Sequence, residues 1–322
     1  MSFRLVLAPG RGSYAKGELG SLRRLAEAAG SDGKGLLATL EAMRRELDPD
    51  LPSLAELDGA KAFKPSLHLP GRNASPLIFA CGLLHAEALR AEGRGPDLVG
   101  GNSLGFYTAL VLAGALEPEQ GYRLVSTMAR LQEQGPAGGQ VLWTLLDDDW
   151  NVVPGRAELV QELCALPDLD LSIRLGGHVV LAGTEEALAT ALERLPEVKV
   201  GERSFPFRLP FHGPFHTPLL LPVAQAALDE LADLPLGRPR IPLLDGRGAE
   251  WSPLSTDPVS LLAYTLGAQV TRTFDFTRMV EVALSDFAPD EVVLLEPGTS
   301  LRAPVGHVER WLASPPTGST AG

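Results

Sequence analysis

The sequence has little of several features that mark particular classes of protein. Cys81 and Cys164 are its only cysteines, too few for a disulfide framework or a cysteine-rich metal site, and this favours a reducing cytoplasm. Lysine and arginine number 28 against 40 acidic residues, and the net charge of −12 argues against nucleic-acid binding, which needs a basic face. No apolar run is long enough for a signal peptide or a membrane span, so we expect no membrane association.

A glycine-flanked serine is the most informative local pattern. Residues 97–105, DLVGGNSLG, place Ser103 between an apolar strand that ends at Val99 and the apolar run 106–116. Strand, Gly-x-Ser-x-Gly and helix in this order are typical of a nucleophile elbow, whose sharp turn exposes the serine hydroxyl. The helix N-terminus behind the serine suits a developing oxyanion. The pattern also fits an ordinary glycine-rich loop, but it makes Ser103 the first candidate nucleophile.

Apolar residues make up 45% of the 322 residues, enough for one large core or two smaller ones. Residues 3–8 are predicted to be a buried strand. Ser75 as N-cap with proline after it predicts the start of an apolar helix that runs to about residue 92. Further on, a helix at 215–232 and strands at 241–244 and 292–295 are expected to complete an α/β main domain.

A smaller unit interrupts this main domain. After the glycine-rich break at 135–139, short elements alternate as strand 140–146, helix 156–165, strands 169–173 and 179–182, helix 184–195 and strand 204–209. This βαββαβ order is the ferredoxin-like arrangement. We therefore predict a main domain at 1–138 and 206–313, an inserted subdomain at 139–205 and a disordered tail at 314–322.

A serine hydroxyl needs a base to remove its proton, so the six histidines are candidates. His212 and His216 lie where the inserted subdomain returns to the main sheet, and such a junction is a natural cleft. A proline and an aromatic residue precede His216 and restrict its backbone. The other four are expected to have structural roles: His68, His85, His178 and His307.

These motifs together resemble the malonyl-CoA:acyl-carrier-protein transacylases and the acyltransferase domains of polyketide synthases. The matching segments run in colinear order from about residue 3 to 305: 9–13 (PGRGS), 101–105 (GNSLG), 214–219 (PFHTPL), Gln269 and 297–298 (PG). The resemblance implies an α/β-hydrolase-like core with a ferredoxin-like insert, in agreement with the βαββαβ order above.

The resemblance also implies a transferase mechanism and the residues that perform it. Ser103 would attack an acyl-CoA thioester to form a seryl acyl-enzyme, with His216 as general base and acid, and the phosphopantetheine thiol of an acyl carrier protein would then take the acyl group. The backbone N–H groups of Arg11 and Leu104 would form the oxyanion hole, and the main-chain carbonyl of Gln269 would orient His216. No metal or redox cofactor is implied, acyl-CoA is a substrate, and a monomer serving fatty acid or polyketide biosynthesis is the expectation.

Two positions depart from the pattern of the resembled family. Asn102 stands before the nucleophile, where relatives usually carry histidine. Met128 stands where malonyl-specific relatives carry an arginine that binds the free carboxylate, and a carboxylate buried without a partner costs about 3 to 5 kcal/mol. The resemblance implies malonyl as the acyl group. Because Met128 is apolar, a neutral short acyl group is the alternative. Arg11, Arg174 and Arg208 are candidates to replace the missing arginine.

Two other functions stay open at this point. An acyl-ACP or acyl-CoA hydrolase on the same scaffold would lose the acyl-enzyme to water rather than to a carrier protein. A non-catalytic protein that docks carrier proteins is the third hypothesis, and the presence of Ser103, His216 and Gln269 argues against it.

Overall fold

A sheet built around the N-terminal strand forms the centre of the main domain. In the computed structural model, which describes residues 2–313, the sheet order is β10-β9-β2-β1-β12. The parallel strands are β1 (Arg4–Ala8), β2 (Leu98–Gly101), β9 (Leu243–Leu244) and β12 (Glu291–Leu294), and the edge strand β10 (Glu250–Trp251) is antiparallel. Every residue of β1 is buried, as expected for a strand covered on both faces, which confirms the predicted N-terminal strand.

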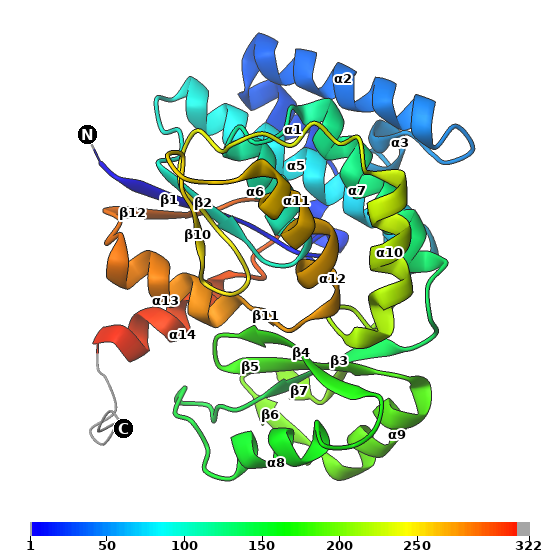
Figure 1. The fold of residues 1–322 in the computed structure, drawn as a ribbon, viewed down its shortest axis with the longest axis vertical. Coiled ribbons are helices and arrows are strands. Elements are labelled where there is room, and N and C mark those ends of the chain that lie inside the picture. The colour runs from blue at the N-terminus through cyan, green and yellow to red at the C-terminus, as the bar shows by residue number, and fades with distance from the viewer. Residues whose placement is uncertain (1, 314–322) are drawn as a thin grey trace.

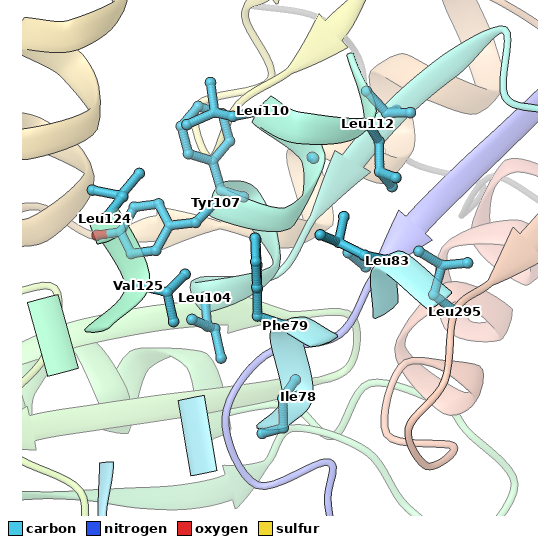
Figure 2. Close-up of a cluster of buried hydrophobic side chains, with 14 of the residues drawn as sticks. Ile78, Phe79, Leu83, Leu104, Tyr107, Leu110, Leu112, Leu124, Val125 and Leu295 are labelled. Carbon is cyan, nitrogen blue, oxygen red and sulfur yellow. The ribbon is translucent and has the colours of Figure 1, made fainter. Parts of the chain in front are cut away.

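Helices cover both faces of this sheet (Figure 1). They are α1 (Ser21–Ala28), α2 (Gly30–Leu47), α3 (Leu54–Asp58), α4 (Pro65–His68), α5 (Gly71–Ala91), α6 (Leu104–Leu112), α7 (Pro118–Glu133), α13 (Phe276–Asp286) and α14 (Arg302–Ala313). Side chains of α5, α6 and α7 meet in one apolar cluster, with Phe79, Leu104 and Val125 among its members (Figure 2). This cluster fixes α7 beside the helix that follows Ser103.

The predicted start of α5 at Ser75 is wrong, because the helix begins at Gly71 and contains Pro76. Proline has no N–H, so the carbonyl of Arg72 lacks its helical donor. Nη1 of Arg44, a buried residue of α2, donates to that carbonyl over 2.6 Å. The compensating donor comes from another helix, so the sequence around Ser75 could not reveal it.

A second sheet, with the order β11-β4-β5-β3-β8, forms the small subdomain. Its strands and helices follow the predicted βαββαβ succession: β3 (Gly139–Thr144), α8 (Arg156–Leu163), β4 (Leu169–Leu175), β5 (His178–Gly183), α9 (Glu185–Arg194) and β8 (Phe207–Leu209). Neighbours among these four strands are antiparallel. The edge strand β11 (Phe274–Asp275) comes from the main domain and pairs with β4 in parallel, so the sheet joins both parts of the chain.

The two faces of this second sheet belong to different apolar cores. Ile173 and Val180 lie in the large core of the main domain, whereas Val141 and Leu181 lie in a smaller core with α8 and α9. Alternate residues of a strand point to opposite faces, so the sheet separates the two cores. Figure 1 shows α8 and α9 on the outer side of the sheet, away from the main domain.

Two predicted elements are wrong in extent. The strand 204–209 is divided at Pro206 into β7 (Arg203–Phe205), which pairs with β6 (Val198–Val200), and β8, which pairs with β3. Proline cannot donate to a ladder, which explains the division. The helix predicted from residue 215 begins as a 3₁₀ turn at Pro218, followed by α10 (Leu221–Glu230), because His216 has a φ of 58° and cannot be helical. Since β8 belongs to the small sheet, that sheet extends past the predicted boundary at residue 205.

The C-terminal third returns to the main domain through α11 (Pro258–Ala263), a π-helical turn (Tyr264–Ala268) and α12 (Gln269–Thr271). The predicted tail at 314–322 lies outside the described residues. Between residues 2 and 313, no helix has both the length and the apolar character needed to cross a bilayer.

Candidate active site

Ser103 lies at the turn between β2 and α6, where its backbone has φ 55° and ψ −111°. Residues other than glycine rarely adopt positive φ, so the turn is strained. Two glycines permit it, since a Cβ on Gly105 would lie 2.1 Å from the carbonyl oxygen of Ala8, and one on Gly101 would lie 2.3 Å from the carbonyl of Gly105. Strand and helix therefore approach more closely than side chains would allow, and the serine hydroxyl points out of the turn toward His216.

His216 contacts both Ser103 and Gln269, one with each ring nitrogen. Its Nε2 lies 2.7 Å from Oγ of Ser103, and its Nδ1 lies 2.7 Å from the main-chain oxygen of Gln269. A carbonyl only accepts, so Nδ1 carries the proton and Nε2 is left to accept from the serine hydroxyl. His216 is 4% exposed, and its burial lowers its pKa to about 4, against the smaller opposite effect of the Gln269 bond. The imidazole is therefore neutral at pH 7, as a base must be.

The side chain of Gln269 forms hydrogen bonds with Tyr107 and with the backbone of Ser103. Its Oε1 accepts from the hydroxyl of Tyr107 over 2.9 Å, and its Nε2 donates to the main-chain carbonyl of Ser103 over 3.2 Å. Tyr107 is buried on α6, one turn after the serine. The family resemblance implied a role for the carbonyl of Gln269. The contact with Tyr107 was missed, although its position one helical turn from Ser103 was an available signal.

His212, the other predicted candidate base, contacts the small sheet and is not among the residues that line the cavity at Ser103. Its Nδ1 lies 2.7 Å from Oε1 of Gln140, whose Nε2 donates to Oγ of Ser172 over 2.7 Å. Ser172 in turn donates to the carbonyl of Phe215 over 2.7 Å. This chain of hydrogen bonds holds the residue before His216 against the small sheet. Gln140 and Ser172 were missed at the level of sequence because they come from β3 and β4, two strands that lie on either side of β5 in the sheet.

Two residues, Arg11 and Leu104, were predicted to form an oxyanion hole with their backbone N–H groups. Arg11 and Leu104 both line the cavity at the serine, and within residues 2–313 neither N–H donates to a main-chain or side-chain acceptor. The N–H of Leu104 lacks a partner because the first turn of a helix has no preceding helical carbonyl. Free main-chain donors on residues that line a cavity can hold the negative charge that develops on a carbonyl oxygen under attack.

A narrow cavity opens beside Ser103, and the space between its atoms, open solvent included, is about 390 Å³. Helix α7 supplies one wall, and the cavity is completed from other elements: Val125, Met128, Ala129 and Gln132 of α7, with Ser75, Phe215 and Val270. Met128 is 1% exposed and faces this space. The wall that the acyl group would contact is therefore largely apolar.

Only two of the predicted acyl-recognition residues border the cavity, Met128 and Arg11. Arg174 pairs with Asp275 over 3.4 Å, and Arg208 pairs with Glu185, so these two arginines are engaged elsewhere. Asn102 contacts the N-terminal strand, its N–H donating to the carbonyl of Ala8, and does not line the cavity. No three or more His, Cys, Asp or Glu side chains in the described part of the chain are arranged to hold a metal ion.

The fold and site define an α/β protein with a serine–histidine pair at a strand–helix elbow. No protein-family model matches the chain. It is 26% identical over 241 residues to the malonyl CoA-acyl carrier protein transacylase of Bacillus subtilis, a match that covers 74% of this chain and 73% of that protein. It is 31% identical over 171 residues to a phenolphthiocerol/phthiocerol polyketide synthase of Mycobacterium tuberculosis, a match that covers 52% of this chain and only 9% of that much longer protein.

Structure comparison agrees with these sequence relatives. The crystal structure of malonyl CoA-acyl carrier protein transacylase from Burkholderia pseudomallei matches with a TM-score of 0.76 and 21% identity, over 96% of this chain and 99% of that one. The resemblance predicted from the motifs, to malonyl-CoA:acyl-carrier-protein transacylases and polyketide synthase acyltransferases, is confirmed. The named transacylases that the chain matches are acyltransferases.

Proposed function

We propose that this protein is an acyltransferase that moves an acyl group from coenzyme A to the phosphopantetheine thiol of an acyl carrier protein through an acyl-enzyme on Ser103. The observation that carries the proposal is the 2.7 Å contact between Oγ of Ser103 and Nε2 of His216. A hydroxyl that donates to a neutral imidazole is activated for attack on a carbonyl carbon. The names of the relatives supply the donor and acceptor, since they are malonyl CoA-acyl carrier protein transacylases.

In such a reaction His216 would carry out each proton transfer. Nε2 of His216 takes the proton of Ser103 as Oγ adds to the thioester carbonyl, and the N–H groups of Arg11 and Leu104 donate to the oxyanion. The C–S bond then breaks, and His216 returns its proton to the sulfur of coenzyme A. In the second half, Nε2 takes the proton of the carrier thiol, the sulfur attacks the ester carbonyl, and Oγ regains its proton as the C–O bond breaks.

We also propose that the main domain is α/β-hydrolase-like and that the inserted subdomain is ferredoxin-like. The antiparallel order β4-β5-β3-β8, with α8 and α9 packed in one core, supports a ferredoxin-like insert. The strand–turn–helix at Ser103 supports an α/β-hydrolase-like main domain around it. A monomer that works in the cytoplasm, in fatty acid or polyketide biosynthesis, is the setting we propose.

Intact-protein mass spectrometry tests the proposal. The protein is incubated with malonyl-CoA or acetyl-CoA, and holo acyl carrier protein is then added. We expect an acyl adduct on Ser103 that moves to the carrier protein, and no adduct on the Ser103→Ala variant. An adduct that is lost to water while holo carrier protein is present would identify an acyl hydrolase instead. Absence of any acyl adduct, on protein whose Ser103 still reacts with a fluorophosphonate, would overturn the proposal.

A further inference from the structure

A buried carboxylate lies where α2, α5 and α7 meet, outside the cavity at Ser103. Asp48, the residue that follows α2, is 3% exposed and is not among the residues that line that cavity. Its Oδ1 accepts from Nη2 of Arg72 in α5, and its Oδ2 accepts from the hydroxyl of Ser126 in α7. One side chain therefore connects the end of α2 with α5 and α7, two helices that supply residues to the cavity wall.

Two arginines compensate the charge of Asp48 inside the protein. Arg72 pairs with it directly, and Nη1 of Arg44, a residue that is 1% exposed, lies 3.7 Å from its Oδ2. Arg44 is itself held, because its Nη2 donates to Oδ1 of Asn73 over 2.6 Å. Hydrogen bonds to an ionised group are roughly twice as strong as those between neutral groups, and buried networks of them are rigid. The carboxylate is therefore a fixed acceptor for the hydroxyl of Ser126.

Ser126 projects from the side of α7, next to the face that lines the cavity. With 3.6 residues per turn, its direction is about 100° from that of Val125 and about 200° from that of Met128, and both of those residues line the cavity. A bond at this angle to the lining face resists rotation of α7 about its axis. Such a rotation would change how far the side chains of Val125 and Met128 reach into the cavity.

Three other polar contacts of α7 with neighbouring elements lie at the surface. They are the ion pairs Arg123–Asp233 and Arg130–Glu230, and the bond from the N–H of Arg72 to Glu133. Each of the four paired side chains is at least 27% exposed, and solvent weakens ion pairs of this kind. The bond between Ser126 and Asp48 is buried at both ends, so it restricts α7 more strongly than these surface contacts do.

We propose that Asp48 is a positioning residue, whose bond to Ser126 fixes the rotation of α7 and with it the wall of the cavity at Ser103. The inference rests on the proposed function and deepens it, since it takes Ser103 as the nucleophile and α7 as the wall that the acyl group contacts. Asp48 and Ser126 do not line the cavity, so they act on the acyl group through Met128 and its neighbours on α7. The position of this wall then determines which chain lengths the cavity accepts.

The test is the ratio of the rates at which p-nitrophenyl butyrate and p-nitrophenyl acetate acylate the protein, measured from the release of p-nitrophenolate. Neither ester needs coenzyme A or a carrier protein. Ser126→Ala keeps the carboxylate of Asp48 and removes its bond to α7. We expect the butyrate-to-acetate ratio to rise by about 5-fold, because a wall helix that can rotate accommodates the longer chain.

Three further variants accompany this measurement. Ser126→Thr keeps the hydroxyl and should keep the wild-type ratio. Ser21→Ala is the matched control, because Ser21 is also buried and donates to a carboxylate, that of Glu18 over 3.3 Å, but lies on α1 and does not line the cavity. Asp48→Asn has one acceptor oxygen in place of two, so it should raise the ratio as Ser126→Ala does, and the double variant should raise it no further. If Asp48→Asn does not fold, the two Ser126 variants decide the question.

An unchanged ratio in Ser126→Ala, whatever the loss of thermal stability, would show that the bond to Asp48 only stabilises the fold. An equal rise in Ser21→Ala would show that general loosening changes the ratio. Either result overturns the inference and leaves the proposed function standing. The expected ratios without transfer of an acyl group to holo carrier protein would support the inference and overturn the transferase. If wild-type protein reacts with neither ester, Ser103 is not an acylated nucleophile, and the proposed function and this inference fall together.

Discussion

Gln269 holds His216 with its main-chain carbonyl and Ser103 with its side-chain amide. One residue therefore sets both the tautomer of His216 and the position of the Ser103 backbone. It follows directly on the π-helical turn Tyr264–Ala268, and such turns often occur at functional sites. The histidine is oriented by a backbone oxygen, which no side-chain substitution can remove.

Substitution of Gln269 should therefore affect stability more than chemistry. In Gln269→Ala the carbonyl that accepts from His216 is retained, and we expect the acylation rate to fall by about 10-fold, far less than the roughly 10⁴-fold lost when the orienting aspartate of a triad is changed. The hydroxyl of Tyr107 loses its acceptor while buried, which should lower the free energy of unfolding by about 1 to 3 kcal/mol. Single-turnover acylation and urea denaturation measure the two effects.

Tyr107→Phe in the Gln269→Ala background is the matched control, because it removes the hydroxyl left without a partner. It should recover part of the lost stability and leave the rate where it was. A loss of about 10⁴-fold in rate for Gln269→Ala, as in a triad that loses its aspartate, would contradict the assignment of the orienting role to the carbonyl.

The pH dependence of acylation should follow the low pKa of His216. Burial lowers this pKa to about 4, and the base is active only when Nε2 is unprotonated. A fall in pH protonates Nε2, so we expect kcat/KM with a neutral ester such as p-nitrophenyl acetate to be flat from about pH 5.5 to 8 and to drop as pH falls toward 4. An inflection near the ordinary histidine pKa of about 6.5 would show that the imidazole is solvated in the working enzyme.

Met128 should set the length of the acyl chain that the cavity accepts. Met128→Ala removes a buried side chain from the cavity wall, and we expect the preference for butyryl-CoA over acetyl-CoA to rise by about 10-fold, at a stability cost of about 2 to 5 kcal/mol. Leu131→Ala is the control, because Leu131 is buried on α7 but does not line the cavity. It should lose stability without a change in chain-length preference. An equal rise of the butyryl-to-acetyl preference in both variants would mean that looser packing of α7, rather than loss of the Met128 side chain, changes the chain length accepted.

The close approach at the elbow predicts a strong effect of a single methyl group. A Cβ at residue 105 would lie 2.1 Å from the carbonyl oxygen of Ala8, and Gly105→Ala should lower the free energy of unfolding by about 3 kcal/mol or more and displace Ser103. Gly17→Ala is the control, since nothing lies within 4 Å of a Cβ there, and it should change stability by less than about 0.5 kcal/mol. Thermal melts of the two variants and fluorophosphonate labelling of Ser103 provide the comparison. Equal stability of both would contradict the steric account.

The parts of the site that follow from local sequence were predictable, and those that follow from packing were not. The turn at Ser103 requires glycines at fixed offsets, and the segment before His216 contains proline and an aromatic residue, so both carry local signals. The Arg44 donor to the helix that contains Pro76, and the Gln140–Ser172 link to Phe215, join residues far apart in the chain. Such contacts depend on which helices and strands become neighbours, and periodicity says nothing about that.

The small sheet also determines where this chain can be recombined with a relative. An exchange of residues 139–205 alone would cut between β3 and its partner β8, and would set a foreign β4 against Phe274 and Asp275 of β11. Because β11 follows α12 closely, poor pairing between β4 and β11 would displace the carbonyl of Gln269. Crossover points that keep residues 139–209 and 269–275 from the same parent leave the sheet whole, so a chimera built to change substrate choice should inherit both segments together.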